Sequence, residues 1–136
     1  MKSRSESLIR LKRFQVDEKR RQVVQIEMMV ADFERMAGEL DQQIEIEHQK
    51  TGISDVAHFA YSTFAKAAHA RRDNLMTSAN DMRERLEAAQ DALAEAIEDL
   101  KKIELLDQRE HMREAQAEAR AEQVEYDEIG RLRHTS

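Results

Sequence analysis

The side chains best suited to chemistry in this sequence are five histidines, which in proteins serve as metal ligands and as acid–base groups. They are His48, His58, His69, His111 and His134. Helical zinc sites use two histidines four residues apart, as in the His-Glu-x-x-His pattern, and no such pair occurs here. His58 and His69 share a helix face but lie far apart along it, because 11 residues separate them. The spacing therefore predicts no metal site.

Other catalytic patterns are also absent from the sequence. There is no cysteine nucleophile, no glycine-rich phosphate loop and no Gly-x-Ser-x-Gly motif. Carboxylates are abundant, but a catalytic carboxylate needs a concave pocket that excludes water. The apolar pattern described next predicts two long helices, and two helices alone do not form such a pocket. We therefore expect a protein without enzymatic activity, catalytic residues, cofactor or small-molecule substrate, whose function depends on surface and shape.

The elements that position these side chains are two long helices. Apolar residues recur about every 3.5 residues from Ile9 to Leu100, on both sides of a break at Thr51-Gly52-Ile53-Ser54. Before the break the seam is Ile9, Val16, Val23, Val30, Ala37 and Ile44, interleaved with Ile26, Phe33 and Leu40. After the break the seam is Phe64, Ala68, Leu75, Ala79, Met82, Leu86, Ala89, Leu93, Ala96 and Leu100. The pattern predicts an all-α fold, an antiparallel two-helix coiled-coil hairpin with a longer second helix that overhangs the first.

Local signals give the bounds of one coiled-coil domain over residues 1–136. Ser3 and Glu6 match a capping box, which predicts helix one over about residues 4–51. Gly52 fits the left-handed position after a helix, so we expect a turn at residues 52–54. Ser54 or Asp55 then caps helix two, which runs over about residues 55–129. Gly130 predicts its end, followed by a frayed tail at residues 130–136.

The composition suits this fold and a cytosolic location. Charged residues make up 37% and aromatic residues 4%, which is typical of a seam flanked by charge and leaves disorder as the competing interpretation. The regular seam argues against disorder. No apolar run approaches the roughly 20 residues of a membrane span, and the basic N-terminus lacks the apolar core of a signal peptide. The absence of cysteine fits a reducing compartment.

Charge is distributed unevenly along the chain. Residues 2–21 contain eight basic and three acidic residues, a net +5, which leaves −11 for the remainder. A turn near residue 54 pairs residues whose numbers sum to about 108, such as Val23 with Leu86. This register places the basic segment beside acidic residues 87–104. We favour that internal neutralisation over a nucleic-acid or membrane patch at residues 2–21, which remains an alternative.

Two regions are left without a structural role in the hairpin. Beyond residue 104 the second helix has no partner, and it carries a new apolar stripe of Leu105, Met112, Ala119 and Tyr126, seconded by Ala115 and Ile129. Such an overhang predicts a missing partner. Near the turn, we expect Phe64 in the core, and Tyr61 is a further core candidate. Phe59 either seals the turn or contacts a partner.

A family resemblance covers nearly the whole chain. The opening segment, residues 7–21, the chain length, the single hairpin and the longer second helix resemble FliJ-type flagellar export proteins. Residues 58–61, 65–68 and 71–75 are similar to the alphaproteobacterial branch of that family. The resemblance implies a component of the flagellar type III export apparatus, cytoplasmic and peripheral at the inner membrane. Such a protein is a stalk-like coiled coil that binds the hexameric export ATPase, contacts the membrane-embedded export gate and escorts export chaperones.

Under this resemblance, partner-binding residues are expected at both ends of the hairpin. Our candidates for contact with the ATPase ring are Arg4, Arg10, Lys12, Arg13, Met112, Tyr126 and Ile129. Our candidates for contact with the gate are Phe59, Tyr61 and His69. The alternative function is a generic cytosolic coiled-coil adaptor or spacer, which self-associates through its C-terminal overhang.

Overall fold

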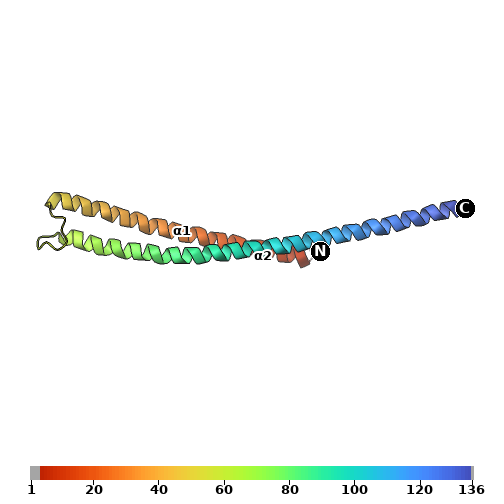
Figure 1. The fold of residues 1–136 in the computed structure, drawn as a ribbon, viewed down its shortest axis with the longest axis horizontal. Helices are drawn as coiled ribbons and strands as arrows, with labels where there is room; N and C mark the ends of the chain where they lie inside the picture. Colours follow the sequence, from red (N-terminus) through yellow and green to blue (C-terminus); the bar gives the residue numbers. More distant parts are fainter. Residues whose placement is uncertain (1–3, 136) are drawn as a thin grey trace. The chain divides into compact units, whose positions relative to one another are not determined.

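The computed structural model describes residues 4–135 and contains two helices, α1 (Arg4–Thr51) and α2 (Thr63–Thr135). No strand occurs among these residues. The helices pack against each other in opposite directions (Figure 1). The predicted all-α hairpin with a longer second helix is therefore confirmed.

Contacts divide the chain into two compact units. The hairpin unit is Asp17–Ala94, and the terminal unit is Met1–Val16 together with Glu95–Ser136. Within the hairpin unit, residues 17–51 of α1 lie beside residues 63–94 of α2 (Figure 1). The assignment of all 136 residues to a single domain stays a prediction.

Helix α1 has the predicted bounds. No proline interrupts it. Gly38 is exposed, and no atom lies close enough to contact a methyl group added at its Cα. The helix ends at Gly52, whose φ of 71° is the left-handed conformation that glycine adopts without strain. The Gly52 N–H donates to the His48 carbonyl at 2.8 Å. Ser3, the proposed N-cap, lies outside the described residues.

The predicted turn at residues 52–54 is wrong, because the connection runs from Gly52 to Ser62 and α2 begins at Thr63. Asp55 starts only one turn: its carboxylate accepts from the Ala57 N–H at 3.0 Å. This turn does not continue as a helix, because the Ala60 N–H donates to His58 Nδ1. In a helix, that N–H would donate to the backbone carbonyl four residues earlier. Ser62 is the cap instead, and its Oγ accepts from the Ala65 N–H at 3.2 Å.

The predicted end of α2 is also wrong. The helix continues through Gly130 to Thr135, so residues 130–135 are helical rather than frayed. One glycine costs a helix only about 1 kcal/mol relative to alanine. Arg133 and His134 lie in the last turn, where basic side chains interact favourably with the negative end of the helix dipole.

The seam of α1 is buried as predicted. All six principal positions are at most 9% exposed; in the hairpin unit these are Val23, Val30, Ala37 and Ile44, and in the terminal unit Ile9 and Val16. The buried positions of α2 are alanines, namely Ala65, Ala68 and Ala79. The larger residues of the α2 seam, such as Leu75 and Met82, are half-buried. Two helices alone leave the sides of each layer open to water, which explains this partial burial.

Phe64 is a wrong core prediction, since its side chain is 53% exposed and Ala65 is fully buried. The seam steps back from Ala68 by three residues rather than four, which turns Phe64 to the side of the coil. Arg72 follows Ala68 by four residues and Ala65 by seven, so it also occupies a seam position. Its Nε is buried and lies 3.0 Å from Asp41 Oδ1, an ion pair without hydrogen-bond geometry. This pairing accommodates a cation within the seam.

The register differs from the predicted one by about one heptad. Cross-helix contacts join Asp41 to Arg72, Glu34 to Arg83, and His48 to His69. Their residue numbers sum to 113, 117 and 117, rather than to about 108. The pairing of Val23 with Leu86 is therefore wrong. The cause is the long connection, because each residue added to the loop moves every partner on α2 further along the chain.

In the terminal unit, residues 4–16 of α1 pack beside the first part of the α2 segment. Ile9 and Val16 are buried there, and Ala96 and Leu100 are half-buried. From residue 108 to residue 134, every described side chain of α2 is exposed. This unit therefore combines a short two-helix contact with a single unpaired helix.

Candidate functional site

The loop between the helices is fixed by hydrogen bonds to the end of α1. The Tyr61 hydroxyl and His48 Nε2 lie 2.8 Å apart, and Ser62 Oγ donates to the Glu47 carboxylate at 2.9 Å. The rings of His48, Tyr61 and His69 form a cluster with centroids 5.5–6.4 Å apart. Because Tyr61 and His69 are half-buried in this cluster, their contribution to a gate contact would be to hold the loop. Sequence reasoning missed His48, which no seam position or motif marks.

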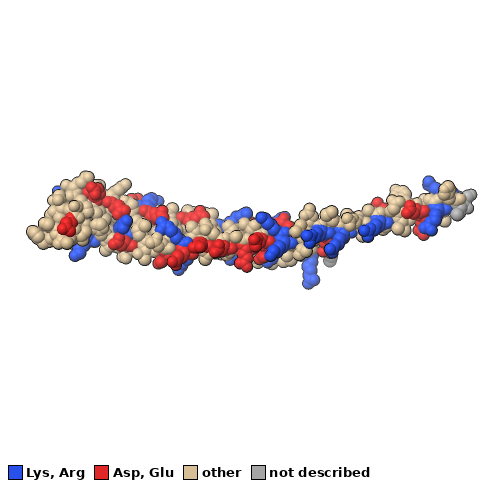
Figure 2. All heavy atoms as spheres, in the orientation of Figure 1, with Lys and Arg blue, Asp and Glu red and all other residues tan. Residues whose placement is uncertain are grey.

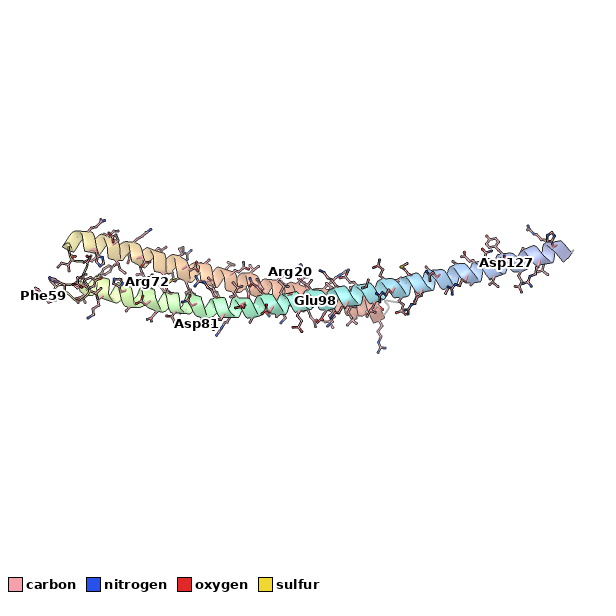
Figure 3. The ribbon with its side chains drawn as sticks, viewed as in Figure 1. Arg20, Phe59, Arg72, Asp81, Glu98 and Asp127 are labelled. Atoms are coloured by element: carbon pink, nitrogen blue, oxygen red, sulfur yellow. The ribbon has the colours of Figure 1, made fainter. Side chains whose placement is uncertain are left out.

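Phe59 is the most exposed large apolar side chain of the loop. Its ring is 97% exposed and stacks on His58 with centroids 4.7 Å apart. Figure 3 shows Phe59 pointing away from the helices at the end of the loop. It therefore does not seal the turn, which was one of the two open interpretations. Val56 is also exposed in this loop and was not predicted.

The basic first turns of α1 lie in the terminal unit and are mostly exposed. Arg4, Arg10 and Arg13 are exposed, and Lys12 is half-buried on the seam. Of these four, Arg13 has an ion pair with α2: its Nη2 lies 4.0 Å from Glu104 Oε2, and both side chains are open to solvent. Exposed pairs of this kind contribute roughly 0–1 kcal/mol. Within residues 4–21, the predicted neutralisation is thus carried by one weak ion pair with α2, which leaves most of this cationic surface available to a partner.

Apolar side chains accompany those basic residues, and sequence reasoning missed them. Leu8, Leu11 and Phe14 are exposed on α1 next to Arg10 and Arg13. They are apolar residues outside the seam and three residues apart, which is a signal that the sequence does contain. A surface that combines cations with exposed leucine and phenylalanine is suited to a protein contact.

The unpaired part of α2 carries the other predicted ring candidates. Met112, Tyr126 and Ile129 are all exposed, and Tyr126 and Ile129 line a shallow hollow with Glu122 and Glu125. Leu105, which belongs to the predicted stripe, is also exposed, and so are three apolar side chains that were not predicted: Leu106, Val124 and Leu132. Whether any candidate residue binds a partner stays a prediction.

Charged side chains cover much of the rest of the surface. Figure 2 shows basic and acidic side chains interspersed along both helices, with acidic side chains gathered along part of α2. Among residues 4–135, no group of three or more His, Cys, Asp or Glu side chains is arranged to hold a metal ion. Within the same residues, neither helix has an apolar stretch of the length and hydropathy needed to cross a bilayer.

Comparison with models of known protein families identifies a match over the whole chain. The family model described as "Flagellar FliJ protein" matches residues 1–136. No curated protein and no solved structure matches the chain significantly. The family match agrees with the resemblance of the opening segment and with the two-helix fold. The chain belongs to the FliJ family, and it is a flagellar export-associated protein.

Proposed function

We propose that this protein is a non-enzymatic, stalk-like coiled coil of the flagellar type III export apparatus, cytoplasmic and peripheral at the inner membrane. It binds the hexameric export ATPase, contacts the export gate and escorts export chaperones. The family supports the export role, and the candidate surfaces support the contacts with the ATPase and the gate. The observation that carries the proposal is the unpaired segment of α2, where residues 108–134 are all exposed.

The ATPase contact combines two surfaces of the terminal unit. One is the basic segment with Arg4, Arg10 and Arg13, and the other is the apolar stripe with Tyr126 and Ile129. Most helical stability in proteins comes from packing against a neighbour, so this unpaired segment gains stability when a partner covers the stripe. A ring of subunits offers a central opening into which one helix end fits.

The gate contact uses the loop that connects α1 to α2. Phe59 is its anchor, because aromatic side chains contribute strongly when a partner pocket buries them. The hydrogen bond between Tyr61 and His48 ties the loop to the end of α1. A loop ordered in advance costs less entropy on binding.

The test is binding to a purified hexameric export ATPase and stimulation of its ATP hydrolysis. Tyr126→Asp combined with Ile129→Asp places charges on the stripe, and affinity should fall at least tenfold, since burial of either side chain is lost. Val124→Asp is the matched control, because Val124 is exposed to a similar degree but faces another side of the helix. Stimulation equal to that of the unmodified protein in the double variant would contradict the proposal.

Self-association through the stripe is the competing interpretation, and sedimentation equilibrium with the same double variant tests it. If sedimentation equilibrium shows a dimer that the double variant abolishes, the stripe binds a second copy. In that case the adaptor alternative replaces the ATPase contact.

A further inference from the structure

The two sides of the helix pair in the hairpin unit differ in charge. On one side, α1 presents Glu27, Glu34 and Asp41 at seven-residue intervals. Glu34 pairs with Arg83 of α2, and Asp41 pairs with Arg72. We call this side the charged flank. Its ionic groups are largely satisfied within the chain.

The other side of α1 in this unit has no charge at the corresponding positions. It presents Gln22, Met29, Met36 and Gln43, again at seven-residue intervals, and we call it the uncharged flank. Met29 is 41% exposed and Met36 is 38% exposed. Half-exposed methionines beside a coiled-coil seam leave apolar surface that a further helix can cover.

A groove on the uncharged flank lies between the two helices. Met36, Leu40 and Leu75 provide its apolar lining, and Glu39, Gln43 and Arg71 provide polar groups. A third helix packs naturally along such a line, because its side-chain ridge fits between two parallel or antiparallel helices. The open sides of the seam layers, where Leu40 and Leu75 are only half-buried, continue along this line.

The α2 edge of this flank carries two cations without partners. Arg71 and Arg85 are exposed, and neither has an ion pair among residues 4–135. Arg72 and Arg83, their neighbours in the sequence, are both paired with acids of α1. Arg71 and Arg85 are two heptads apart, which is about 21 Å along a helix. The charge therefore favours an occupant with acidic residues along this edge.

We propose that the uncharged flank of the hairpin unit is a docking site for one amphipathic α-helix of a partner protein, with acidic residues on the edge that faces α2. Its apolar ridge covers Met29, Met36 and Leu75, and its acids lie against Arg71 and Arg85. This site goes beyond the proposed function, since it shares no residue with the surfaces assigned to the ATPase or to the gate.

Two designed helical peptides of about 28 residues test the proposal with the full chain. Both carry the same apolar ridge. One has two glutamates 14 residues apart on one edge, and the other has lysines at those two positions. Fluorescence anisotropy should show the glutamate peptide binding about tenfold more tightly at low salt, with the difference shrinking as salt rises. Equal affinities for the two peptides, or no binding of either, would overturn the proposal.

Charge reversal on the protein identifies the site. Arg71→Glu combined with Arg85→Glu should reverse the preference between the two peptides, whereas Met36→Glu should weaken both. Arg20→Glu combined with Lys66→Glu is the matched control, because it changes the net charge equally at exposed positions away from the groove. Circular dichroism checks that each variant folds. Reversal by the control pair, or a dimer that Met36→Glu dissociates, would reject the partner helix as the occupant.

Discussion

Two stretches of the same helix behave differently. Residues 63–94 of α2 bury Ala65, Ala68 and Ala79, whereas every side chain at residues 108–134 is exposed. Both stretches are helical and both contain recurrent apolar residues. Only the first has α1 beside it. A helical pattern thus creates a face that can be buried, but a neighbouring helix decides whether the face is buried.

Stability should follow burial rather than helicity. An apolar side chain stabilises the fold when it leaves water, by roughly 25 cal/mol per Å² of apolar surface. The unpaired segment gains little of this energy, so it is expected to open locally more often than the hairpin unit. Matched substitutions in the two stretches measure this difference directly.

The largest difference in the free energy of unfolding is expected when valine is replaced by aspartate, once at a buried position and once at an exposed one. Val30 is 9% exposed and Val124 is 59% exposed. Val30→Asp should destabilise the fold by about 3 kcal/mol or more, because it buries an unpaired carboxylate. Val124→Asp should change the free energy of unfolding by about 0.5 kcal/mol or less. Urea denaturation followed by circular dichroism measures both, and similar losses in the two variants would refute the contrast.

A smaller difference is expected for truncation of matched isoleucines. Ile44 is 5% exposed and Ile129 is 49% exposed. Ile44→Ala should cost about 2–4 kcal/mol, from lost burial and the cavity that remains. Ile129→Ala should cost about 0.5 kcal/mol or less in the isolated protein. Thermal unfolding compares the two, and a large effect at Ile129 would mean that this segment is already covered by a second copy.

The smallest effect, opposite in sign at the two sites, is expected at the glycines. Gly52 ends α1 with a positive φ, so Gly52→Ala should destabilise the hairpin by about 1 kcal/mol. Gly130 lies within α2 with nothing near its Cα, so Gly130→Ala should raise the helicity of the C-terminal segment. Hydrogen exchange resolves both changes. Faster exchange near residue 130 after the substitution would argue against a helix there.

The first helix was predictable because its signals are local and regular. Val16, Val23 and Val30 recur every seven residues, and Gly52 is a strong stop signal at the end. The overhang was predictable as well. The apolar residues shift to another face of the helix after Leu100, because the first helix is too short to pair with the rest of the second. The candidate residues on these surfaces were therefore found largely by asking which apolar residues the seam does not use.

The loop and the register were not predictable in the same way. Asp55 and Ser62 are both good N-caps, and the choice depends on bonds that Ser62 and Tyr61 make to α1. The wrong choice shortened the loop and moved the cross-helix pairs by about a heptad. The seam itself survived this error, because a shift by a whole heptad leaves the same faces in contact.

The amino-acid sequence alone established two long helices, their buried faces and the excess length of the second, because periodicity and helix stops are properties of neighbouring residues. The tertiary structure decided which residues meet: Arg72 with Asp41 and His48 with Tyr61. It left Arg71 without an ion pair among residues 4–135. These contacts join residues that are far apart in the sequence. They therefore depend on the length of the loop and on the packing of α1 against α2, which no local pattern specifies.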